Sequence, residues 1–288
     1  MTEPRLNHVQ CITARGLHRL AYWEWGVATN PNVLVCVHGL SRQGRDFDVL
    51  GEALSDRYRV VCPDIVGRGQ SGRLADPMGY AISAYVADMV TMLARVNATT
   101  LHWVGTSMGG LIGLMLAALP QSPIQKLVLN DVGPAIQADA LQRIGTYLGA
   151  PLRWASVDEA TAYLQSISQG FGPHTPAQWA ALSQPMIVAD GDGYKLHYDP
   201  AIAVPFRAIT PELAALGEAA LWKAYDSLSC PTLLLRGAES DLLTRSTAVA
   251  MTTRGPKARL HEFPGVGHAP TLVQPDQIEV VREFLLSP

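Results

Sequence analysis

Short apolar runs alternate along the chain with longer segments of helical periodicity, a pattern typical of strand–helix–strand units around a parallel sheet. The run at 33–37 is continuously apolar, as expected of a strand buried on both faces. Similar runs predict further strands at 58–62, 100–105, 126–130, 232–236 and 259–263. Helical patterns fall between them, most clearly at 81–96, 108–119, 246–253 and 275–286.

Two stretches depart from this rhythm. The opening segments 8–13 and 17–25 are expected to form an antiparallel pair that turns at Arg15-Gly16. Residues 135–228 are rich in Ala, Leu, Trp and Tyr but show no strand–helix alternation, and we interpret them as a mainly helical cap inserted over the sheet. Within the cap, the turn at 190–193 joins two short extended pieces. The core domain is then formed by 1–134 and 229–288.

Composition narrows the class of protein. The 288 residues carry 22 Lys and Arg against 25 Asp and Glu, so no basic surface points to nucleic acid or to an anionic membrane. The four cysteines form no C-x-x-C pair, which argues against zinc or redox chemistry. The first residues lack an apolar signal core, and the apolar stretch 111–119 is too short to cross a bilayer. We therefore expect a cytoplasmic protein without metal or cofactor, with a homodimer left open.

The sharpest motif is Gly105-Thr-Ser107-Met-Gly109, which stands directly between a predicted strand and a predicted helix. Reversing from strand to helix in one tight turn strains the backbone at the serine and lifts its hydroxyl above the sheet. The two glycines leave room for that turn because they carry no Cβ. The alternative is a chance glycine-serine loop, but the strand before the motif and the helix after it favour a nucleophile elbow.

With this elbow, the chain resembles the α/β-hydrolase family over residues 33–286, in the branch of serine esterases and enol-lactonases that carry a helical cap. The resemblance implies a mostly parallel eight-stranded sheet flanked by helices, and catalytic residues in the order serine, acid, histidine. Ser107 is then the nucleophile. Haloalkane dehalogenases and epoxide hydrolases place aspartate at that position, so both activities are disfavoured.

The family order places the general base after the last strand, where Gly265-Val-Gly-His268-Ala-Pro270 stands. His268 is therefore the predicted base, since His261 lies within the strand run itself. The acid is expected after the preceding strand, and Asp241 matches the family's G-x-x-x-D spacing from Gly237. Glu239 is a local competitor. Asp131 is a second one, because some members carry the acid after the strand at 126–130.

The segment Val37-His38-Gly39-Leu40 closes the first buried strand and resembles the family's oxyanion loop. It implies an oxyanion hole formed by the backbone N–H groups of Leu40 and Met108, with His38 shaping the loop and transferring no proton. The sequence His-Gly-Leu differs from the His-Gly-Gly-Gly of the hormone-sensitive-lipase branch, which argues against that branch.

Two further motifs resemble known binding motifs but lack features that those motifs require. Gly67-Arg-Gly-Gln-Ser-Gly72 matches G-x-G-x-x-G, but no helix begins at the glycines, as a dinucleotide fingerprint requires. We interpret it as the structural loop that the family has before its second core helix. Asp190-Gly-Asp-Gly193 suggests a calcium loop, but the glycine at position six and the glutamate at position twelve are missing.

The resemblance predicts hydrolysis of a small carboxylic ester or lactone through an acyl-serine intermediate. A C–C bond hydrolase and a thioesterase use the same triad and stay open as alternatives. A non-catalytic small-molecule sensor is the alternative of another class, disfavoured by the intact triad. Three arginines of the predicted cap are candidates for binding a substrate carboxylate, although solvated surface positions are the simpler interpretation for each: Arg143, Arg153 and Arg207.

Overall fold

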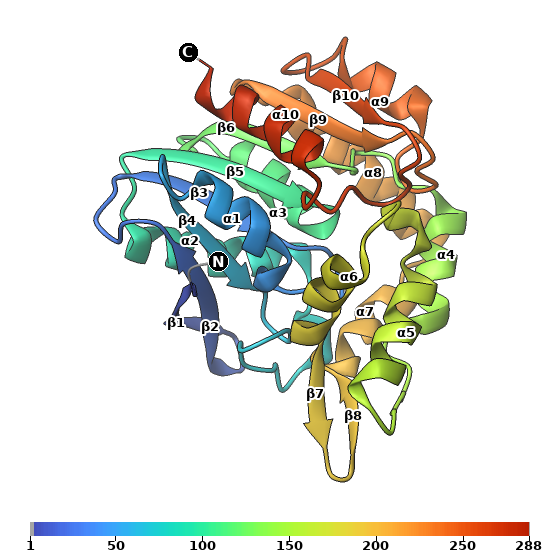
Figure 1. The fold of residues 1–288 in the computed structure, drawn as a ribbon. Coiled ribbons are helices and arrows are strands. Elements are labelled where there is room, and N and C mark those ends of the chain that lie inside the picture. Colours follow the sequence, from blue (N-terminus) through green and yellow to red (C-terminus); the bar gives the residue numbers. More distant parts are fainter. Residues whose placement is uncertain (1–2, 288) are drawn as a thin grey trace.

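The structure, a computed structural model, describes residues 3–287. Its body is one twisted sheet with the strand order β1-β2-β4-β3-β5-β6-β9-β10 (Figure 1). Only the pairings β1–β2 and β2–β4 are antiparallel, which confirms the predicted mostly parallel eight-stranded sheet. The strands are β1 (Arg5–Thr13), β2 (Gly16–Trp25), β3 (Asn32–Val37), β4 (Arg59–Asp64), β5 (Thr100–Thr106), β6 (Ile124–Asn130), β9 (Thr232–Gly237) and β10 (Arg259–Phe263).

Both faces of the central strands are buried, which explains their continuous apolar runs, whereas the edge strand β1 alternates between buried and exposed residues. Along β3, Val33 and Val35 pack in one hydrophobic cluster and Leu34 and Cys36 in the other, on opposite sides of the sheet. Helices α2 (Ile82–Val96), α3 (Met108–Ala117) and α9 (Arg245–Met251) belong to the first cluster, whereas α1 (Asp48–Leu54) and α10 (Pro275–Leu286) belong to the second. The short helix α1 was not predicted from the sequence.

The chain between β6 and β9 forms a separate group of helices and one hairpin, at the right of Figure 1. Antiparallel pairing of β7 with β8 confirms the turn predicted at 190–193. A capping box at Thr175 begins one of the helices, because its side chain accepts from the backbone of Gln178 and the Gln178 side chain accepts in return. The elements are α4 (Ala138–Tyr147), α5 (Val157–Ile167), α6 (Pro176–Ser183), β7 (Ile187–Asp190), β8 (Gly193–Leu196), α7 (Ala203–Arg207) and α8 (Pro211–Asp226).

Backbone hydrogen bonds tie this inserted segment to loops at the carboxyl ends of core strands. After β4, the amide of Gly69 donates to His197 O at 3.1 Å and the amide of Asp199 donates to Gly67 O at 2.7 Å. After β10, the amide of Gly267 donates to Gly170 O at 2.6 Å. The inserted segment is therefore anchored at the edge of the sheet where the predicted elbow lies. No helix within residues 3–287 has the length and apolar character needed to cross a membrane.

Candidate active site

Ser107 occupies the sharp turn between β5 and α3. Its backbone has φ 51° and ψ −116°, a strained conformation for a residue with a side chain. The turn depends on its glycines, since a Cβ on Gly105 would lie 2.3 Å from Gly109 O and one on Gly109 would lie 2.0 Å from Val37 O. The strand, elbow and helix therefore have the arrangement that the motif predicts, with the serine at the amino end of α3.

The imidazole of His268 lies between a hydroxyl and a carboxylate. Its Nε2 is 3.1 Å from Ser107 Oγ, and its Nδ1 is 2.7 Å from Asp131 Oδ2. His268 stands in the loop after β10, and the side chain of Asn130 helps to hold that loop, because its Nδ2 donates to Pro270 O at 2.8 Å. The structure thus brings Ser107 and His268 together, as the sequence predicts, but with Asp131 as their acidic neighbour.

Asp131 follows β6 directly and is completely buried. Its Oδ1 accepts from the amide of Gly237 at 2.9 Å, and its Oδ2 accepts from Ser240 Oγ at 2.6 Å as well as from His268. Both carboxylate oxygens are therefore paired, as a buried charge requires. The backbone at Asp131 has φ 56°, a left-handed conformation that aspartate tolerates better than most residues.

The placement predicted for Asp241 is wrong. Its side chain is half exposed and receives two hydrogen bonds from Arg143, at 2.8 and 3.0 Å. The chain after β9 turns so that Ser240 points inward to Asp131 and Asp241 points outward. The competitor Glu239 is exposed as well. The sequence carries one signal for Asp131. It directly follows the strand next to the elbow strand, and adjacent parallel strands end side by side.

The loop after β3 presents its glycine to the nucleophile. A Cβ on Gly39 would lie 3.7 Å from the Cβ of Ser107. The side chain of His38 is buried, with Nδ1 donating to Gly39 O at 2.7 Å and Nε2 accepting from the amide of Ile65 at 2.9 Å. Burial lowers the pKa of His38 to about 3, so the ring is neutral and shapes the loop. Leu40, next in the chain, lines the space beside Ser107.

Arg68, which the sequence analysis did not single out, is a buried cation behind this loop. Its Nε donates to Leu40 O at 2.9 Å, and Nη1 donates to Tyr85 Oη at 3.0 Å and Val66 O at 2.7 Å. The guanidinium carbon lies 5.2 Å from the centre of the Tyr85 ring. These contacts fix the loop that carries Leu40, in agreement with the structural interpretation of the glycine motif at 67–72.

Two cavities of different chemistry meet at Ser107. One, of about 120 Å³, is lined by His268 and hydroxyl side chains but also by many apolar ones, such as Ile167 and Phe171. We call it the polar cavity because its lining includes the charged side chains of Arg42, Asp46 and Arg143. The other, of about 690 Å³, is lined mainly by apolar side chains and reaches Met108. Of the cap arginines considered from sequence, Arg143 lines the first cavity. Arg153 is bound to Asp190 and Asp192, and Arg207 donates to Leu148 O.

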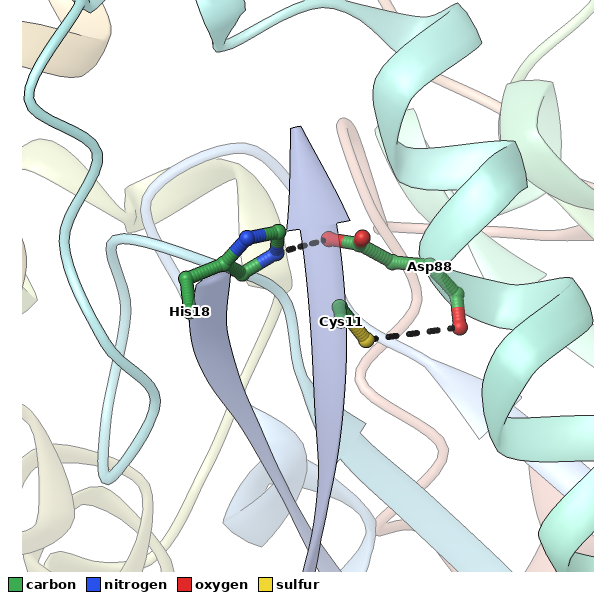
Figure 2. Close-up of side chains that lie close together, drawn as sticks. All are labelled: Cys11, His18 and Asp88. Atoms are coloured by element: carbon green, nitrogen blue, oxygen red, sulfur yellow. Dashed lines mark hydrogen bonds and ion pairs between the residues drawn. The ribbon is translucent and has the colours of Figure 1, made fainter. Parts of the chain in front are cut away.

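One cluster within the described residues has the side chains of a metal site. Figure 2 shows Cys11 of β1, His18 of β2 and Asp88 of α2, whose ligand-type atoms lie within 4.8 Å of one another. His18 Nε2 donates to Asp88 Oδ2 at 2.9 Å, so the pair joins the opening hairpin to α2. Burial raises the pKa of Cys11 to about 12, which keeps the thiol protonated. None of the three lines either cavity at Ser107.

Comparisons with known proteins agree with this architecture. Residues 34–280 match the family model described as the alpha/beta hydrolase family. A 3-hydroxybutyrate-oligomer hydrolase of Cupriavidus necator is 55% identical over 286 residues, covering 98% of each chain. A solved alpha/beta hydrolase from Novosphingobium aromaticivorans is 34% identical, with a TM-score of 0.86 over 99% of each chain. The solved E-2-(acetamidomethylene)succinate hydrolase, 20% identical, has a TM-score of 0.82 over 98% of this chain and 100% of its own. The chain therefore belongs to the α/β-hydrolase family.

Proposed function

We propose that this chain is a serine hydrolase that cleaves the ester bonds of short 3-hydroxybutyrate oligomers. The observation that carries the proposal is the position of His268, within hydrogen-bonding distance of Ser107 Oγ on one side and of Asp131 on the other. The substrate class is suggested by the relative of Cupriavidus necator, which resembles this chain over nearly its whole length. The linkage of such an oligomer is a carboxylic ester, the bond predicted from the sequence.

The contacts support a mechanism in two stages. Ser107 Oγ attacks the ester carbonyl while its proton passes to His268 Nε2, and Asp131 holds the imidazole by accepting from Nδ1. The backbone N–H groups of Leu40 and Met108 stabilise the oxyanion. His268 then protonates the departing alkoxide, and water releases the acyl group by the same steps in reverse order. In this proposal Asp131 takes the role that the sequence analysis gave to Asp241.

The remaining sequence-based interpretations are part of the proposal. Residues 135–228 act as a cap that closes the site, supported by the backbone bonds that anchor this segment beside the elbow. The partner is a small-molecule ester, and the protein works in the cytoplasm without a metal or cofactor. A homodimer stays open. The acid end of the substrate is expected beside Arg143, which lines the polar cavity next to His268.

The direct test is hydrolysis of the 3-hydroxybutyrate dimer by purified enzyme and by Ser107→Ala. The substitution should lower kcat on the order of 10⁶-fold. Ser246→Ala, in an exposed position on α9, serves as the matched control and should retain wild-type turnover. A fluorophosphonate probe should add once to the wild type, at Ser107. Retention of turnover by Ser107→Ala, or cleavage of a thioester in preference to every ester, would contradict the proposal.

A further inference from the structure

The two cavities at Ser107 receive different halves of an ester. His268 and the residues after it, Ala269 and Pro270, line only the polar cavity. The departing alkoxide must lie beside His268 Nε2, because that atom supplies its proton. The alcohol half of the substrate is therefore placed in the polar cavity, whose volume is about 120 Å³.

The acyl half must point the other way. Once the carbonyl carbon is bonded to Ser107 Oγ, its oxygen faces the amides of Leu40 and Met108 and its alkoxide faces His268. The remaining substituent is the acyl chain. Met108 lines only the second cavity, whereas Leu40 and Ser107 line both, so the acyl chain enters the second cavity.

This second cavity is large and apolar. Its volume of about 690 Å³ corresponds to roughly twenty groups of the size of a water molecule or a methylene. Glu218, which is exposed, is the one charged side chain among the described residues that line it. Its walls come from α2, α3 and the inserted segment with α8, and include Leu111, Ile136, Leu141, Phe206, Ile209 and Leu221.

Apolar side chains are also exposed where α7 leads into α8. Ile209 and Leu213 both line the cavity and remain about half exposed, and Val204 and Leu216 are exposed nearby. Exposed apolar side chains that gather beside a pocket are one feature of ligand-binding grooves. Here they continue the apolar lining from the cavity outward, which suits the entry of an apolar chain.

We propose that the cavity lined by Leu111, Phe206 and Leu221 is an acyl chamber for straight medium-length chains, so that the enzyme also hydrolyses medium-chain acyl esters. This inference rests on the proposed ester hydrolysis and extends it to a second substrate class. A butyryl group fills only a small part of the chamber. Each added methylene that leaves water can raise kcat/KM by up to about three- to fourfold.

The test compares p-nitrophenyl acetate, butyrate, octanoate and decanoate, which share one leaving group. The kcat/KM for octanoate should exceed that for butyrate by at least about tenfold, since four further methylenes become buried. Leu221→Trp, which fills the chamber from α8, should reduce this octanoate-to-butyrate ratio to about one. Leu119→Trp is the matched control, because Leu119 is exposed and lines neither cavity, and it should leave the ratio unchanged.

Ile209→Trp provides a second filling variant at a partly exposed position, where a larger side chain costs little folding energy. A ratio near or below one in the wild type, or a ratio unchanged in both chamber variants, would overturn the inference. If the 3-hydroxybutyrate dimer is still cleaved in that case, the proposed function stands and only the acyl chamber fails. If no ester is cleaved and Ser107 is not labelled, both proposals fail.

Discussion

Asp131 and His268 form a hydrogen bond of 2.7 Å between Oδ2 and Nδ1, although 137 residues separate them in the chain. The carboxylate stands at the end of β6, next to β5, and these two strands pair in register through Thr106 and Asn130. Asn130 Nδ2 also donates to Thr106 Oγ1 at 2.9 Å. The carboxylate and the nucleophile therefore follow neighbouring residues of two paired strands.

Asp131→Asn is expected to lower kcat for p-nitrophenyl butyrate by about 10⁴-fold, because an amide in this place favours the wrong imidazole tautomer. Asp241→Asn is the matched control and should change kcat by less than about threefold on this neutral ester. Both variants should be compared at equal folded fraction by circular dichroism. A larger loss in Asp241→Asn than in Asp131→Asn would restore the assignment made from sequence.

Ser240 is expected to act as a positioning residue for Asp131. Its Oγ donates to Asp131 Oδ2 at 2.6 Å and accepts from the amides of Leu242 and Leu243 at 3.3 and 3.2 Å. Ser240→Ala should lower kcat by about tenfold with little change in KM, since the loss of one hydrogen bond at a charged group amounts to about 1.5 kcal/mol. Ser240→Thr, which retains the hydroxyl, should recover most of the rate. Equal losses in kcat and in thermal stability for both variants would show a merely structural role.

Arg143 is expected to recognise the free carboxylate of a 3-hydroxybutyrate oligomer. It lines the polar cavity, but its guanidinium is held by Asp241 in the structure. Arg143→Gln should raise KM for the dimer several-fold and leave KM for the methyl ester of the dimer unchanged. Asp241→Asn, which releases Arg143, should lower KM for the free acid. Arg153→Gln serves as the control, and equal effects on acid and methyl ester would exclude carboxylate recognition.

The stability of the fold is expected to decrease on acidification because of buried neutral histidines. Burial and the charge of Lys126 lower the pKa of His102 to about 4, compared with about 6.5 for an unfolded histidine. Between these values the unfolded chain binds a proton that the folded chain does not, so stability falls as the pH falls through this window. Burial lowers the pKa of His38 to about 3, which acts in the same direction.

His102→Gln should remove one of these contributions. In urea unfolding from pH 7 to 4.5, the free energy of unfolding of the wild type should fall more steeply than that of the variant, by up to about 1.4 kcal/mol per pH unit. Glutamine can still form a hydrogen bond with Tyr58 Oη, which lies 2.9 Å from His102 Nδ1. Parallel pH curves for the two proteins would contradict the prediction. Groups with the opposite pH dependence, such as Asp64, contribute equally to both proteins, so their effect disappears from the difference. Burial raises the pKa of Asp64 to about 6.

The central strands of the sheet could be predicted from sequence because they are buried on both faces and leave continuous apolar runs. The elbow could be predicted as well, because the close approach of the backbone in so sharp a turn requires Gly105 and Gly109. The identity of the acidic residue beside His268 could not be predicted in this way. Asp131 and Asp241 both follow strands of the sheet, and only the turn after β9 decides which side chain points inward. Arg68 was overlooked because its role depends on contacts with Leu40 and Tyr85, which lie in distant segments.

The backbone hydrogen bond that Gly267 donates to Gly170 O makes the support of His268 different from that of Ser107 and Asp131. Serine and carboxylate both extend from the rigid middle of the sheet, whereas the imidazole lies in a loop fastened to the inserted segment. In the proposed mechanism, a displacement of that segment during substrate entry would act on the loop of His268, which the side chain of Asn130 also ties to β6. Under the proposed function, opening of the inserted segment and alignment of the general base would in this way be coupled.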